Sequence, residues 1–154
     1  MIAGGHGEPN PNTTWVNARG FWLAYILGVT ILHLCLLSIP ILTVPMAWTL
    51  TCLLHNLAHL FFLHSIKGHP WMSIDTGSAS NLTHWEQIDD GKPFTESRKF
   101  LTAVPIIIFL LACLYTKNDQ DHFIANFLSL VVVLLPKLPK FHNSSNEQWM
   151  WRES

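Results

Sequence analysis

Four stretches of the chain consist almost entirely of apolar residues, and polar segments separate them. The apolar stretches run from Phe21 to Ile39, from Val44 to Leu63, from Phe100 to Tyr115 and from Phe123 to Leu135. The first two are close to the length of about 20 residues that a helix needs to cross the hydrocarbon core of a bilayer. The pattern therefore predicts an all-α integral membrane protein with four transmembrane helices.

The last two apolar stretches are shorter than a full crossing, so we expect their helices to continue into the flanking polar residues. The expected spans are about residues 21–39, 44–63, 98–116 and 122–138. A re-entrant hairpin formed by the last two stretches is the structural alternative, because a short pair of helices need not cross the bilayer.

Composition supports a membrane protein. The chain has 154 residues, of which 49% are apolar and only 12% are charged, whereas soluble domains carry about 25% charged residues. The net charge of −1 supplies no basic field that would attract nucleic acid. We therefore expect membrane lipids as surroundings and no nucleic-acid partner.

The distribution of positive charge predicts the orientation. With four spans, one side of the membrane receives the N-terminus, the central loop and the C-terminus. Eight of the nine Lys and Arg residues fall on that side: Arg19, Lys67, Lys92, Arg98, Lys99, Lys137, Lys140 and Arg152. The positive-inside rule then places both termini in the cytosol. The three N-glycosylation sequons begin at Asn12, Asn81 and Asn143, and we expect none of them to carry a glycan.

Histidines in the second stretch raise the question of a metal site. His55 and His59 are four residues apart on one helix face, and His64 follows. Paired histidines of this kind hold iron in membrane hydroxylases, but those sites need several such pairs, and zinc needs three or four ligands. A metal-dependent lipid hydroxylase is the alternative that this pattern leaves open.

Interhelical hydrogen bonding is the favoured interpretation of the polar residues inside the apolar stretches. Polar side chains in membrane helices normally face other helices rather than lipid. The same interpretation covers His33, Asn56 and Asn126. Because we also find no nucleophile elbow and no phosphate-binding glycine loop, we predict that the protein is not an enzyme and needs no cofactor. Lys137 and Lys140 are interpreted as a membrane-surface anchor.

The N-terminal segment carries one candidate binding residue. Asn10, Pro11 and Asn12 favour a turn, because Asn side chains bond to their own backbone and Pro presets the backbone angle. In the predicted topology, the amide of Asn12 lies just outside the cytosolic membrane face, where it could bond to the polar head of a lipid.

Several strings, in order along residues 8–142, closely resemble one family, the Orm/ORMDL proteins of the endoplasmic reticulum. The most specific are LTHWEQID from Leu82 to Asp89 and SRKFLT from Ser97 to Thr102. The others are NPNT (10–13), RGFWL (19–23), WTLT (48–51), HSIKGHP (64–70) and PKLP (136–139).

The resemblance implies a function that the residue pattern alone does not. Members of this family are multi-pass proteins of the endoplasmic reticulum membrane that associate with the large subunits of serine palmitoyltransferase. They inhibit that enzyme, the first of sphingolipid synthesis, when ceramide is abundant. The second asparagine of the family's NPN motif contacts ceramide, and Asn12 matches it here. Phe21 and Phe62 are nominated as apolar lining for the lipid, because both lie near the cytosolic ends of their helices.

The chain departs from the family at its end. We expect residues 1–142 to form one membrane domain, and residues 143–154, which read NSSNEQWMWRES, to form an atypical polar tail. The departure puts any contact of the usual tail with the enzyme in doubt. A general membrane scaffold or folding factor is the remaining alternative for function.

Overall fold

The computed structural model of the chain describes residues 14–65, 83, 85, 88 and 95–138. Helices occupy all four apolar stretches: α1 (Phe21–Leu37), α2 (Val44–His59), α4 (Glu96–Tyr115) and α5 (Gln120–Leu134). Three short elements complete them: η1 (Thr14–Asn17) before α1, a π-helical turn η2 (Leu60–Ser65) continuing α2, and η5 (Leu135–Lys137) continuing α5. The prediction of an all-α fold is confirmed for the described residues.

Local sequence explains where each helix begins. Three of the helices begin after a polar capping residue: Thr43 before α2, Thr95 before α4 and Asp119 before α5. The side chain of each accepts a hydrogen bond from a backbone N–H in the first turn. Such caps satisfy donors that a helix end leaves unpaired. Before α1, Gly20 adopts a left-handed conformation with φ of 83°, which glycine tolerates at no steric cost.

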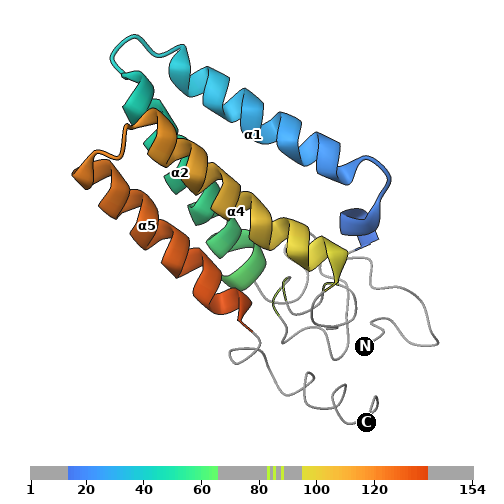
Figure 1. Cartoon of the computed structure of the whole chain (residues 1–154). Helices are drawn as coiled ribbons and strands as arrows, with labels where there is room; N and C mark the ends of the chain where they lie inside the picture. The colour runs from blue at the N-terminus through green and yellow to red at the C-terminus, as the bar shows by residue number, and fades with distance from the viewer. Residues whose placement is uncertain (1–13, 66–82, 84, 86–87, 89–94, 139–154) are drawn as a thin grey trace, which may run out of the picture.

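The four helices run side by side, with their two short turns at one end (Figure 1). The turn between α1 and α2 and the turn between α4 and α5 form what we call the hairpin end. The first described residues, and those that end η2 and η5, lie toward the opposite end, which we call the open end. Helix α2 is central, because it packs against α1, α4 and α5.

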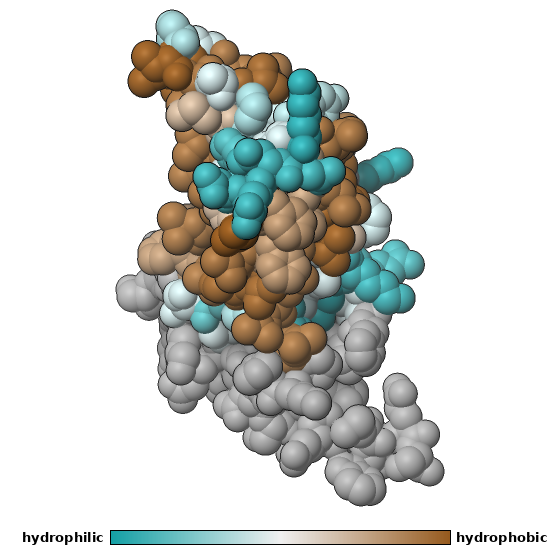
Figure 2. Space-filling view, turned by 60° about the vertical axis from the view of Figure 1, so that its left-hand side comes forward, coloured by the Kyte–Doolittle hydropathy of each residue, from teal (hydrophilic) through white to brown (hydrophobic). Residues whose placement is uncertain are grey.

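Two helical segments are long and apolar enough to cross a membrane, Val44–Ser65 and Glu96–Tyr115, whereas α1 is a shorter apolar helix. Large hydrophobic side chains remain exposed on all four main helices, and they cover most of the described surface in the view of Figure 2. Helix α1 contains no buried residue. An apolar exterior of this extent is what a bilayer covers, so the described part of the chain is that of a membrane protein. Four crossings and cytosolic termini stay predictions.

An apolar cluster closes the open end of the bundle. Val16 of η1, Leu63 of η2 and Leu101 of α4 meet Trp85 and Ile88 there, and each is 6% exposed or less. The side chains of Trp85 and Ile88 are buried against the helices, where they complete this cluster.

Candidate functional site

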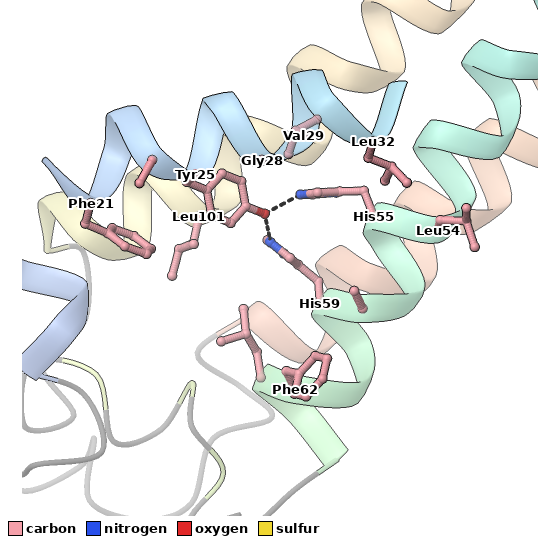
Figure 3. Close-up of a pocket in the computed structure, with 13 residues that line it drawn as sticks. Phe21, Tyr25, Gly28, Val29, Leu32, Leu54, His55, His59, Phe62 and Leu101 are labelled. Carbon is pink, nitrogen blue, oxygen red and sulfur yellow. Dashed lines mark hydrogen bonds between the residues drawn. The ribbon is translucent and has the colours of Figure 1, made fainter. Parts of the chain in front are cut away.

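A cavity of about 470 Å³ lies between α1 and the continuous helix α2–η2. Both phenylalanines nominated from sequence line it: Phe21 is the first residue of α1, and Phe62 lies in η2 (Figure 3). Most of the other lining residues are apolar, among them Gly28, Val29, Leu32, Leu54, Leu63 and Leu101. Asn12, the third nominated residue, lies outside the described residues. The lining of the cavity suits an apolar chain.

One polar group interrupts the apolar wall. The hydroxyl of Tyr25, on α1, lies between the Nε2 atoms of His55 and His59 on α2, and it hydrogen-bonds to both (Figure 3). All three residues line the cavity. This confirms the interpretation of His55 and His59 as interhelical hydrogen-bonding residues, and it identifies Tyr25 as their partner on α1.

Lys137 determines the direction of these hydrogen bonds. Its Nζ lies 3.4 Å from Nδ1 of His59, 3.0 Å from Nε2 of His64 and 3.4 Å from the carbonyl oxygen of Val133. An ammonium group donates only, so Nδ1 of His59 must accept. His59 then carries its proton on Nε2 and donates it to the Tyr25 oxygen.

The remaining partners follow from that direction. The Tyr25 hydroxyl donates to Nε2 of His55, and His55 donates from Nδ1 to Oδ1 of Asn56 at 3.1 Å. Asn56 in turn donates from Nδ2 to Oγ of Ser129 on α5, at 2.9 Å. A continuous chain of donors therefore begins at Lys137, passes from α2 to Tyr25 on α1, returns to α2 and ends at Ser129 on α5. It joins these three helices in one hydrogen-bond network.

A second polar group joins α2 and α5 nearer the hairpin end. Asn126 is fully buried, and its Nδ2 donates to Oγ1 of Thr49 at 3.3 Å. The Thr49 hydroxyl lies 2.7 Å from Nδ1 of His122. In the described part of the chain, Oδ1 of Asn126 has no hydrogen-bond partner. The prediction that Asn56 and Asn126 bond between helices is confirmed, although Asn126 is only half satisfied.

The interpretation of Lys137 as a surface anchor is wrong. Lys137 is only 7% exposed, and its ammonium group lies 5.1 Å from the centre of the Trp85 ring. Arg98 lies at the same distance from that ring, and its Nη2 donates to the carbonyl oxygen of Trp85 at 2.6 Å. Two buried cations therefore hold Trp85 at the open end through attraction to its ring. The burial of Lys137 could not be predicted from local sequence, because the histidines that it contacts are more than 70 positions away.

The geometry also bears on the alternative of a metal-dependent hydroxylase. The described residues contain no group of three His, Cys, Asp or Glu side chains arranged to hold a metal ion. Where His59 and His64 come together, the Lys137 ammonium lies beside both. A cation fixed there repels a metal ion, so this position does not suit one.

Tyr25 and Lys137 are the two functional candidates that sequence reasoning missed. Tyr25 had a signal, because a hydroxyl inside an uncharged apolar stretch must find a partner in lipid. Lys137 had none, because its position next to Pro136 and Lys140 is equally typical of a membrane-surface segment.

Comparison with known proteins agrees with the motif resemblance. The signature of the ORMDL family matches residues 10–145. The ORM1-like protein of Drosophila melanogaster is 64% identical over 141 residues, 92% of each chain. ORM1-like protein 2 and ORM1-like protein 3 of Homo sapiens are 57% and 54% identical over 137 residues, which are 89% of this chain and 90% of theirs. The chain therefore belongs to the ORMDL family.

Proposed function

We propose that the protein is a non-catalytic subunit that inhibits serine palmitoyltransferase in response to ceramide, and so limits sphingolipid synthesis. The observation that carries the proposal is the apolar cavity between α1 and α2–η2, lined by Phe21 and Phe62, in a chain of the ORMDL family. A cavity of this kind takes up a lipid chain. The hydrogen-bonding side chains in its wall, Tyr25, His55 and His59, bond to one another. This arrangement is consistent with binding rather than catalysis.

The protein acts, in this proposal, as a multi-pass protein of the endoplasmic reticulum membrane. The charge distribution and the two hairpin turns favour four crossings, with the open end in the cytosol. Helix α5 has 15 residues and spans about 22 Å, so η5 and a locally thinner bilayer complete its crossing.

Contacts at the open end supply a route from the cavity to the N-terminal segment. Leu63 and Leu101 line the cavity and also pack in the cluster that buries Val16. Val16 is only four residues beyond Asn12. Ceramide in the cavity therefore presses on the residues that hold η1, while the Asn12 amide bonds to its polar head.

Inhibition follows if ceramide binds the blocked state of the complex more tightly than the open state. In the blocked state, the N-terminal segment obstructs passage of substrate or product through the large subunits of the transferase. Binding without such a difference in affinity would leave the enzyme unaffected.

The direct test of the site compares Asn12→Ala with Asn10→Ala in microsomes that contain the transferase and no other ORMDL protein. Asn12→Ala should weaken inhibition of sphingoid-base synthesis by added ceramide, and Asn10→Ala should not. Unchanged inhibition in Asn12→Ala would remove Asn12 from the site. Co-purification of each variant with the large subunits controls for assembly. The same measurement distinguishes this proposal from a general scaffold, because a scaffold would bind many membrane proteins and form no stoichiometric complex with the transferase.

A further inference from the structure

A second cavity, of about 350 Å³, lies under the other side of α1, between α1, α2 and α4. Tyr25 and Val29 line both cavities, so these two side chains form the partition between them. The walls of the second cavity are mainly branched and aromatic: Val29, Trp48, Phe100, Val104, Ile107 and Ile108. Nothing in the proposed function uses this space.

Three rings in contact lie at the hairpin end of the second cavity. The ring of His33 on α1 lies 4.0 Å from that of Trp48 on α2, and Trp48 stacks on Tyr115 of α4 with centroids 4.7 Å apart and an interplanar angle of 8°. Trp and Tyr rings prefer the level of the lipid headgroups. This end of the cavity therefore lies near a membrane surface, and its other end extends toward the bilayer centre.

His33 brings one unused hydrogen-bonding atom to this place. Its Nδ1 lies 2.9 Å from Oγ1 of Thr51, and the Thr51 hydroxyl donates to the carbonyl oxygen of Ala47 at 2.8 Å. His33 therefore donates from Nδ1, and its Nε2 is left as an acceptor. Within the described residues, Nε2 has no hydrogen-bond partner. An unpaired polar atom in apolar surroundings is costly, so a ligand that donates one hydrogen bond is favoured.

We propose that this second cavity is a sterol site, in which the single hydroxyl of a membrane sterol donates to Nε2 of His33 and the fused rings lie along α4. A sterol has one donor at one end and an apolar body, which matches one acceptor at the end of an apolar cavity. Its rigid rings lose little conformational freedom between the branched walls, in contrast to an acyl chain. Trp48, which also lines the cavity, lies beside the ring of His33 at this end.

The site is separate from the proposed ceramide site. Phe62 lines only the first cavity, and His33 and Ala103 line only the second. Substitutions at these positions therefore address one cavity at a time. Sterol binding also needs no palmitoyltransferase, so it is measured on the chain alone.

The test places the full chain in phosphatidylcholine vesicles with a photoreactive cholesterol analogue and measures labelling. Unlabelled cholesterol should compete, and cholest-4-en-3-one, which lacks the donor, should compete about 2- to 10-fold less well, the range expected for one hydrogen bond. Ceramide should not compete. Equal competition by the ketone removes the His33 hydrogen bond from the proposal, and competition by ceramide equal to that of cholesterol makes the cavity a general lipid site. Either result overturns it.

Three variants locate the site. Labelling should fall about 2- to 10-fold in His33→Phe, which keeps a ring against Trp48 but removes the acceptor. It should be lost in Ala103→Phe, which fills the cavity, and it should be unchanged in Phe62→Ala. Wild-type labelling of both His33→Phe and Ala103→Phe refutes the site. The ketone comparison uses the unaltered chain, so the proposal remains testable if a variant folds poorly.

Discussion

The ammonium nitrogen of Lys137 lies 3.0 Å from Nε2 of His64, a residue 73 positions earlier in the chain. This contact joins the end of η5 to the end of η2, beside the ring of Trp85. The same nitrogen also donates to Nδ1 of His59, and this second contact starts the donor chain that continues through Tyr25 and joins α1 to the bundle. The open end of the protein is therefore held together by a buried cation rather than by apolar packing alone.

Replacing Lys137 with Met should destabilise the protein. Met fills similar space, but it leaves Nδ1 of His59 without the donor that Lys137 supplies, at a cost of about 1–3 kcal/mol in the free energy of unfolding. Lys99→Met is the matched control, because Lys99 is exposed on α4 and surface changes stay within about 0.5 kcal/mol. Unfolding of both variants in the same detergent measures the difference, and equal stability would show that the Lys137 contacts contribute nothing.

The two buried asparagines should respond differently to the same substitution. Asn56→Leu leaves the donor of His55 unpaired and breaks the bond to Ser129, which should lower the free energy of unfolding by about 1–3 kcal/mol. Asn126→Leu loses one bond to Thr49 but also removes the unpartnered Oδ1. Its cost should stay below about 1 kcal/mol. A larger loss in Asn126→Leu than in Asn56→Leu would contradict the donor chain from Lys137 to Ser129.

Neighbouring phenylalanines in η2 provide a matched pair for the first cavity. Phe62 lines the cavity and Phe61 does not, although the two rings are similarly exposed, at 44% and 54%. Phe62→Ala should therefore weaken ceramide inhibition of sphingoid-base synthesis by roughly tenfold or more, as expected for losing about 1.5–3 kcal/mol of apolar burial. Phe61→Ala should leave the ceramide response intact. If both variants respond to ceramide like the wild type, the lipid does not occupy this cavity.

Membrane topology is open to a protease-protection experiment in sealed microsomes. Short epitope tags at either terminus should be digested, and a tag inserted after Asn118, in the turn between α4 and α5, should be protected. Asn118 has a positive φ of 56° in a tight turn, so insertion there disturbs no helix. Digestion of the inserted tag without detergent would overturn the four-span arrangement, and a glycan at Asn12, Asn81 or Asn143 would do the same.

Sequence pattern was enough to locate the helices. Apolar stretches placed all four, and the first begins at Phe21 as expected, although it ends at Leu37 rather than at residue 39. Pattern was also enough to assign His55 and His59 to interhelical bonding, because buried polar groups in lipid need partners. It was not enough to identify the partners. The positions of Lys137 and Trp85 depend on contacts between distant segments, which periodicity does not encode.

The candidate site was predictable only in part. Phe21 and Phe62, nominated because both lie near the cytosolic ends of their helices, line the same cavity. Their contact with a lipid stays a prediction. The second cavity had no such signal, because its lining comes from three helices, α1, α2 and α4. It depends on how these helices pack together, and no single helix sequence contains that information.

Purified serine palmitoyltransferase large subunits, assayed for sphingoid-base synthesis with and without this chain across a series of ceramide concentrations, test the central claim most directly. Ceramide should lower activity only when the chain is bound, and Asn12→Ala and Phe62→Ala should shift the response to higher ceramide. A ceramide response that is the same with and without the chain would contradict this claim.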